Sequence, residues 1–600
     1  MALPERCPAW VRRILAIPRL LERAANLAAA LLLCALVAAL ALNVAARAFD
    51  LSIVGAALVA GWAFSALAFA TLPALLAHDE AGPRAIVAAA IAGFATATLA
   101  AGLVDAASRV GGVEPVLAIP RAWRYAAAAG FSGLALVAAL RRPWSALGLA
   151  LGVAVSTLPL APQPPLIGAA VFAAALACRT PVALALVAGV AVSPGHLSEA
   201  ALAQNLMRGL SPYVLLAIPL FILAAGLMLA GGIGERLVAA SAWFAGRRRS
   251  ALGEANVFAS TFFGGVSGSS IADAALGARL LVPAMIAAGY PAARAAAITA
   301  ASAVLPNVLP PSIALLLAAA ATDQSVGALW VAGLGAGLVL AAMLWASVRF
   351  TPVGPPAPAA TKPPTAPATT PERSATDRRG PPRTTPGASP APLAEPPGAK
   401  VLWGLLPPVL IAVAVLGGLR LGVVTSVEAG LLAVGMALLF AIPAGMRPIL
   451  AAVWDCALQS GRVALLIGAA TPVGFVFATS GIDAAALLPD GPAVVQLLAA
   501  SLIALLVGTV LDVGAAILLL LPVLVPAIGG DTIHTTLVVT VALLLGGLTP
   551  PVGILVLVVK DATQIGGVYR AVLPYLLALI AGLIALIAMP ALTSGLAGLV

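Results

Sequence analysis

Charged side chains are scarce in this chain of 600 residues, and so are the residues that build disulfide and metal sites. Only 9% of the residues are Asp, Glu, Lys or Arg, whereas 62% are hydrophobic. Soluble proteins carry about 25% charged residues, so the composition excludes an ordinary soluble globular protein. The four cysteines form no Cys-x-x-Cys pair, and the three histidines have no metal-ligand spacing. We therefore expect neither a disulfide framework nor a metal centre, and no Gly-Lys-Ser/Thr phosphate loop indicates nucleotide hydrolysis.

Long apolar runs fill most of the chain. Runs of 18 or more residues recur, and each can cross a hydrocarbon core of about 30 Å. The net charge of +10 comes from basic residues in short loops, a pattern that orients membrane helices and does not indicate nucleic-acid binding. Arg12, Arg13, Arg19 and Arg23 precede a run over 24–46 that is longer than a signal-peptide core. The sequence predicts an all-α, multi-pass protein of a bacterial inner membrane with a cytoplasmic N-terminus.

Composition divides the chain into five segments. They are a four-helix block (1–142, with spans near 26–46, 52–77, 85–104 and 124–140), a connector helix and loop (143–165), an apolar block (166–350), a Pro-rich segment (351–400) and a second apolar block (401–600). The Pro-rich segment holds 15 of the 49 prolines and almost no large apolar residue, which predicts a flexible loop.

The two apolar blocks contain the same construction. A Leu-Val-Pro-Ala motif ends at Ala284 in one block and at Ala527 in the other, and an uncharged run of 28 residues follows each motif. A proline pair breaks each run near its middle, Pro310-Pro311 and Pro550-Pro551. Prolines remove backbone donors and unwind helices, and paired broken helices in two halves point to the binding sites of transporters. Two ordinary proline kinks are the alternative.

Each repeat carries one lone carboxylate, Asp273 or Asp512, in an apolar environment. Ionisable residues at such depth are functional by default. Superposing the two motif prolines shifts the numbering by 243 and pairs Ser269 with Asp512. Hydroxyl, carboxylate and unwound carbonyl oxygens suit a hard cation such as Na⁺. A helix cap or an interfacial residue is the alternative for both carboxylates.

Several motifs, in order, resemble the large permease subunit of tripartite ATP-independent periplasmic (TRAP) transporters. They are Ile218–Gly226, Gly264–Asp273, Val424–Ala429 and Gly547–Gly553, and together they cover 166–600. The first block resembles the small permease subunit of the same family, through Arg47, the loop 78–84 and the stretch 119–123. The resemblance implies a fused small-plus-large permease. It also implies an elevator-type fold with two inverted repeats, each with a re-entrant hairpin and a broken helix. The implied activity is Na⁺-driven uptake of an organic anion received from a periplasmic binding protein.

The candidate sites follow from the repeat and the resemblance. We expect one cation site per repeat, without any other cofactor, formed by Ser267, Gly268, Ser269, Asn307, Asp512, Gly547, Thr549 and Pro550. We expect the substrate to lie near Ser270, Asp273, Pro310, Pro311, Pro551 and Gly553.

Two other functions compete with this interpretation. A dicarboxylate/sodium symporter of similar hairpin architecture would need no binding protein. Alternatively, Gly265–Gly268 fits the Gly-x-Ser-Gly pattern of intramembrane serine proteases. That chemistry needs a base beside the serine, and no histidine falls inside a predicted span, so the sequence favours a transporter that is not an enzyme.

Overall fold

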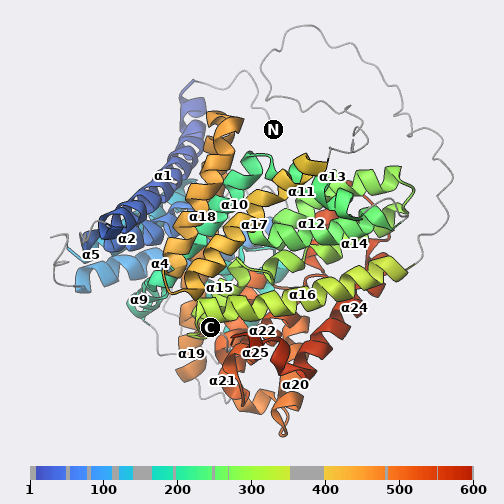
Figure 1. The fold of residues 1–600 in the computed structure, drawn as a ribbon. Helices are drawn as coiled ribbons and strands as arrows, with labels where there is room; N and C mark the ends of the chain where they lie inside the picture. The colour runs from blue at the N-terminus through green and yellow to red at the C-terminus, as the bar shows by residue number, and fades with distance from the viewer. Residues whose placement is uncertain are drawn as a thin grey trace, which may run out of the picture.

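The computed structural model describes residues 9–48, 54–76, 83–110, 120–138, 165–192, 198–245, 250–267, 269–351, 398–479, 484–550 and 552–597. The regular structure within these ranges is helical (Figure 1). The helices are α1 (Ala9–Ala48), α2 (Val54–Ala70), α3 (Leu72–Leu76), α4 (Pro83–Arg109), α5 (Ala122–Ala138), α7 (Pro165–Ala177), α8 (Val182–Val192), α9 (Glu199–Gly209), η2 (Tyr213–Leu216), α10 (Ala217–Ala230), α11 (Ile233–Ala245), α12 (Ala251–Ser267), α13 (Ser270–Ala287), α14 (Ala292–Ser302), η3 (Leu305–Asn307), α15 (Ile313–Ala321), α16 (Val326–Phe350), α17 (Gly398–Arg420), α18 (Ser426–Ala441), η4 (Ile442–Ala444), α19 (Met446–Thr479), η5 (Ala484–Leu487), α20 (Ala493–Gly508), α21 (Val513–Ala527), α22 (Thr532–Gly546), α23 (Ile554–Thr563), α24 (Val568–Ala588), η6 (Pro590–Leu592) and α25 (Ser594–Ala597).

The lengths and composition of these helices fit a membrane protein. Among the described residues, nine helical segments are long and apolar enough to cross a bilayer. Their outer faces carry large apolar side chains such as Leu439 and Leu577, which a lipid environment accommodates. The prediction of an all-helical, multi-pass membrane protein is confirmed.

Two helical hairpins in the apolar blocks have short arms. Their arms are α12 and α13 in the first block and α20 and α21 in the second, and each arm has 15 to 18 residues. At 1.5 Å per residue such arms are about 22–27 Å long. The prolines of the repeated motif, Pro283 and Pro526, lie at matching places in the returning arms α13 and α21.

A broken helix follows each hairpin, at the proline pair that the sequence singles out. In the first block α14 ends at Ser302 and α15 begins at Ile313. In the second block α22 ends at Gly546 and α23 begins at Ile554. The two blocks interlock, because α13 packs against α23 and α15 packs against α21.

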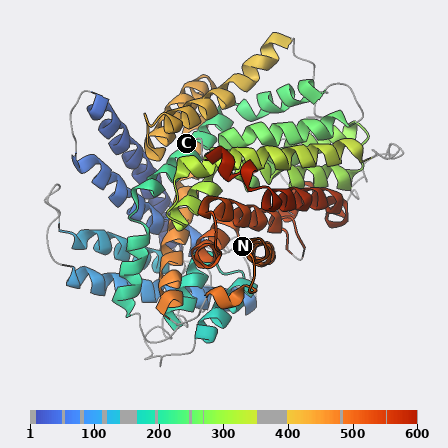
Figure 2. The ribbon, with the colours of Figure 1, turned by 60° about the horizontal axis from the view of Figure 1, so that its bottom comes forward.

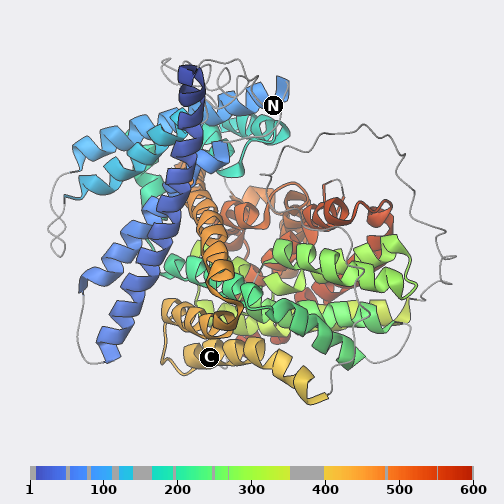
Figure 3. The same ribbon diagram turned by 90° about the horizontal axis from the view of Figure 1, so that it is seen from above.

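The N-terminal block lies along one side of the molecule. Its helices α1, α2, α4 and α5 (blue) are separated from the hairpins by the long helix α19 (orange), as Figures 2 and 3 show. Helices α1 and α2 pack directly on α19, and Gly461 permits the close approach, since a Cβ there would meet the Leu67 carbonyl at 2.6 Å. Arg124 of α5 donates to the Ser65 hydroxyl at 2.6 Å and to the Ser211 hydroxyl at 3.3 Å. This side chain therefore joins the N-terminal block to the segment after α9.

Some predicted features lie outside the described residues. They are most of the connector (143–164), most of the Pro-rich segment (352–397), Gly268 and Pro551.

Candidate functional site

The returning arms of the two hairpins begin at equivalent capping residues. Ser269 is the N-cap of α13, and its hydroxyl accepts a hydrogen bond from Ala272 N at 3.4 Å. Asp512 is the N-cap of α21, and its carboxylate accepts one from Gly514 N at 3.1 Å. These are the two residues that the shift of 243 pairs. The capping role that the sequence left open as an alternative is therefore present at Asp512.

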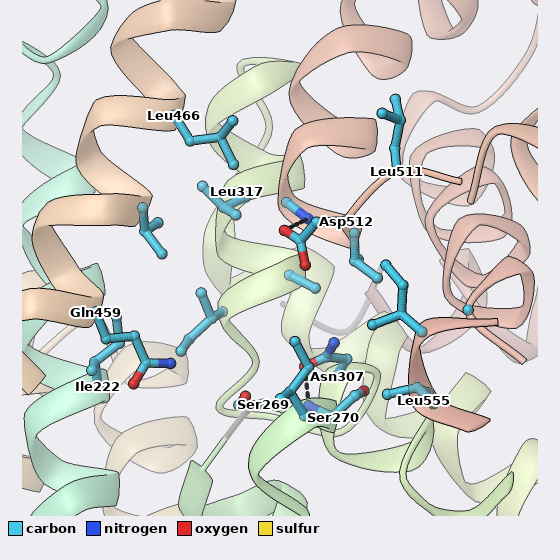
Figure 4. A pocket seen from close by; sticks show the side chains of 18 residues that line it. Ile222, Ser269, Ser270, Asn307, Leu317, Gln459, Leu466, Leu511, Asp512 and Leu555 are labelled. Atoms are coloured by element: carbon cyan, nitrogen blue, oxygen red, sulfur yellow. Dashed lines mark hydrogen bonds between the residues drawn. The ribbon is translucent and has the colours of Figure 1, made fainter. Parts of the chain in front are cut away.

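A cavity of about 140 Å³ lies between the two hairpin tips and α19. Figure 4 shows Asp512 on one wall, Ser269, Ser270 and Asn307 on a second, and Gln459 on a third. The lining residues are Ile222, Ser269, Ser270, Ile271, Asn307, Ile313, Ala314, Leu317, Gln459, Val463, Leu466, Leu511, Asp512, Val513, Gly514, Gly547, Ile554 and Leu555.

Hydrogen bonds hold the first helix break against the first hairpin. Asn307 Oδ1 accepts from Ser270 N at 3.2 Å, across the gap between η3 and α13. The Ser312 hydroxyl donates to Asn307 O and, as the N-cap of α15, accepts from Leu315 N in the first turn of that helix. The indole of the buried Trp330 donates to Ser312 O at 3.3 Å. These bonds satisfy part of the backbone that the proline pair releases from the helix.

The second break is fixed in a different way. Gly547 O accepts from Leu555 N at 3.0 Å, so one hydrogen bond bridges the unwound stretch. Gly553 has φ of +55°, a left-handed conformation that favours glycine. The Tyr569 hydroxyl donates to Val552 O at 2.5 Å. The Thr549 hydroxyl donates to Leu545 O at 3.0 Å, which leaves the lone pairs of its oxygen available.

The structure brings some of the predicted site residues together. Ser269, Ser270, Asn307, Asp512 and Gly547 all line the cavity, although they come from four separate segments.

Other predicted residues do not line this cavity. Asp273 is 6% exposed and lies inside the first hairpin, where the Ser260 hydroxyl donates to it at 2.6 Å. Pro310, Pro311 and Gly553 are buried in the breaks, Thr549 is half-buried and Pro550 is exposed. Ser267 is the last residue of α12.

Most of the lining residues were absent from the predicted sites, among them Ile222 and Gln459. Ile222 lies on α10, and Gln459 lies in the middle of α19, far from either repeat motif. No motif marks Gln459, because its position follows only from the packing of α19 against α21.

The lining is mostly apolar and carries little charge. Asp512 is its single ionisable side chain, and no Lys, Arg or His is among the described lining residues. A carboxylate in an apolar surrounding favours a bound cation, since an isolated charge there is costly. The cavity therefore suits a cation better than an unaccompanied anion.

Comparison with known proteins identifies the family. Residues 169–592 match the family of the tripartite ATP-independent periplasmic transporter, DctM component. The chain belongs to this DctM family. Its relatives are transporter permeases, so this protein is a multi-pass permease of the inner membrane and not an enzyme, which excludes the protease alternative.

Individual relatives cover most of the same region. The 2,3-diketo-L-gulonate TRAP transporter large permease protein YiaN of Escherichia coli is 28% identical over 65% of this chain and 88% of its own length. The C4-dicarboxylate TRAP transporter large permease protein DctM of Pseudomonas aeruginosa is 29% identical over 66% of this chain and 89% of its own. The sialic acid TRAP transporter large permease protein SiaM of Vibrio cholerae is 29% identical over 63% of this chain and 84% of its own. The names of these relatives span different organic acids.

Proposed function

We propose that this DctM-family permease carries an organic anion into the cell, driven by a Na⁺ gradient, after receiving it from a periplasmic binding protein. The observation that carries the proposal is the cavity in which Asp512, Asn307 and both hairpin tips meet without a basic side chain among the described lining residues. The tripartite family and the organic acids in the names of the relatives support the substrate class and the partner.

The two cation sites are assigned to the oxygen atoms around the hairpin tips. The first site would use Ser267, Gly268 and Ser269 with the carbonyl of Asn307. The second would use Asp512 with the Gly547 carbonyl and the Thr549 hydroxyl. Asn307 O and Gly547 O each accept one hydrogen bond, so each keeps a second lone pair for a cation. Oxygen ligands of this kind match a hard cation.

Transport would proceed by an elevator movement of the two hairpins and the two broken helices relative to α10, α19 and the N-terminal block. Support comes from the hairpins and broken helices, which form an interlocked unit, whereas α1 and α2 pack on α19. The N-terminal block would act as the small-permease module fused to the large one, with its N-terminus in the cytoplasm. The cavity lies at the boundary between the two parts, where substrate would face each side in turn.

The first experiment tests coupling. Purified permease is reconstituted in liposomes with its periplasmic binding protein, and uptake is compared with Na⁺ or K⁺ outside at equal ionic strength. We expect uptake only with Na⁺. Undiminished uptake in K⁺ overturns the Na⁺ assignment, and equal uptake without the binding protein favours the binding-protein-independent symporter.

The second experiment tests the cation ligands by thermal unfolding of the purified protein in NaCl against KCl. Asp512→Ala should raise the Na⁺ concentration for half-maximal stabilisation at least about tenfold, which corresponds to about 1.4 kcal/mol. Ser269→Ala should also raise this half-maximal Na⁺ concentration.

Both residues are also helix caps, so the variants need matched controls. Asp531 caps α22 through Ile533 N at 3.0 Å, and Ser325 caps α16 through Ala328 N at 3.3 Å. Both lie outside the cavity. Loss of an aspartate or a serine cap lowers the free energy of unfolding by about 0.5–2 kcal/mol. Asp531→Ala and Ser325→Ala should therefore lower the unfolding temperature without changing the Na⁺ dependence. If all four variants keep the wild-type Na⁺ dependence, the two-site assignment is wrong.

A further inference from the structure

Gln459 occupies the wall of the cavity that faces the hairpin tips. It lies on α19, a helix of 34 residues outside both hairpins and both broken helices. In Figure 4 its amide group extends from α19 toward the wall that carries Ser269, Ser270 and Asn307. The cavity thus has a polar group from α19 in addition to those from the hairpins and broken helices.

The helix face around Gln459 shows that this amide is an exception to an apolar stripe. Gln459, Val463 and Leu466 all line the cavity, at the spacing that places residues on one face of a helix. The other two members are apolar, as expected for a helix that packs against α21. An amide at this position is therefore not required for packing.

One neutral polar group at the cavity is buried without a hydrogen-bond partner among the described residues. It is the Ser270 hydroxyl, in a residue that is 3% exposed. Asn307, whose Oδ1 accepts from Ser270 N, lies beside it, and Gln459 is an exposed residue on the α19 wall of the same cavity. Buried polar groups are nearly always hydrogen-bonded in native proteins, so an unpaired hydroxyl at a cavity indicates a ligand that supplies the missing partner.

We propose that Gln459, with the Ser270 hydroxyl and Asn307 Nδ2, selects a substrate bearing hydroxyl or oxo groups besides its carboxylate. An amide can donate to a hydroxyl or oxo oxygen and accept from a hydroxyl, and a serine hydroxyl can do both. Sites built to hydrogen-bond such a group reject the analogue that lacks it, because their own polar groups are then left unpaired. This inference rests on the proposed function and narrows its substrate class to small hydroxy- or oxo-carboxylates.

The wall on α19 also gives Gln459 a role that the hairpin residues do not have. The cation ligands and Ser270 belong to the hairpins and broken helices, whereas Gln459 belongs to α19, the helix on which the N-terminal block packs. Gln459 and Ser270 can bind the same substrate molecule only while the hairpins lie next to α19, as they do in this structure. Gln459 therefore acts on substrate choice without being a cation ligand.

The test compares pairs of acids that differ only in hydroxylation. Thermal stabilisation of the purified full-length permease in NaCl is measured with D-gluconate against hexanoate and with lactate against propionate, since a ligand that binds the native state raises its stability. In the wild-type protein we expect at least one hydroxylated acid to bind at least tenfold more tightly than its counterpart. Gln459→Leu should reduce that ratio to below threefold while keeping the stabilisation by Na⁺ alone.

A matched control and the contrary results make the test decisive. Gln496→Leu introduces the same change on α20, outside the cavity, and should keep the wild-type preference. The inference is overturned if neither acid of any pair binds, if both acids of each pair bind equally, or if Gln459→Leu keeps the wild-type ratio. Failure of the proposed cation coupling would instead appear as a loss of Na⁺ stabilisation in the wild-type protein.

Discussion

Gly508 and Gly546 allow the second hairpin to contact its broken helix backbone to backbone. A Cβ on Gly508 would lie 3.1 Å from Leu543 C and 3.2 Å from Leu543 Cα, and closer still to the carbonyl oxygen of that residue. A Cβ on Gly546 would lie 2.6 Å from the backbone of Gly508. No flexible side chain can move aside at either place. The variant Gly508→Ala must therefore push α20 and α22 apart.

The expected cost follows from this geometry. Overpacking a tight contact costs about 1–3 kcal/mol. Replacing glycine by alanine within a helix raises the free energy of unfolding by up to about 1 kcal/mol. Gly508 is the last residue of α20, where this gain is smaller. We expect the free energy of unfolding to fall by about 1–2 kcal/mol. We also expect a higher Na⁺ requirement, because Asp512 lies only four residues beyond Gly508.

The assay is thermal unfolding of purified variants, with Gly435→Ala as the control. Gly435 lies on the exposed face of α18, and a Cβ there meets nothing within 4 Å. The variant Gly435→Ala should therefore raise the free energy of unfolding by about 0.5–1 kcal/mol through helix propensity alone. The two substitutions are chemically identical and should shift the unfolding temperature in opposite directions. An unfolding temperature of Gly508→Ala at or above that of the wild type, with normal Na⁺ dependence, would refute the close crossing of α20 and α22.

Two further predictions concern the second break and the topology. Gly553→Ala should lower the unfolding temperature and the uptake more than Gly422→Ala does. Both glycines have a positive φ, of +55° and +67°, which disfavours alanine. Only at Gly553 would an added Cβ also lie close to a backbone atom, 3.3 Å from Thr549 O. Equal effects would show that the backbone conformation alone matters. In a cysteine-free background, Ala288→Cys and Asp490→Cys mark the bases of the two hairpins at exposed positions. We expect an impermeant thiol reagent to label Ala288→Cys from the cytoplasm and Asp490→Cys from the periplasm, and labelling of both from one side would disprove inverted repeats.

Local sequence signals predicted the two helix breaks, and the resemblance to the family implied the hairpins. Proline pairs and the repeated Leu-Val-Pro-Ala motif act within a few residues, so their effect on the backbone can be read without tertiary information. The equivalence of Ser269 and Asp512 came from numbering alone, and both residues are N-caps of returning arms.

Features that depend on which helix packs where could not be predicted in the same way. Asp273 lies one turn from the capping Ser269, yet its carboxylate meets Ser260 of the neighbouring arm and does not line the cavity. Gln459 belongs to a long helix with no motif, and only the approach of α21 to α19 places it in the cavity. Sequence spacing within one helix carries no information about either contact.

The asymmetry between the two caps supports the cation assignment. A serine hydroxyl caps α13 and an aspartate carboxylate caps α21, and each accepts a backbone hydrogen bond from the first turn of its helix. Capping by itself therefore does not require a charge at Asp512. The N-terminus of a helix offsets only about half an elementary charge. No basic side chain among the described lining residues supplies the remainder, and an uncompensated charge in apolar surroundings is costly. A cation bound at Asp512, as proposed above, would supply it.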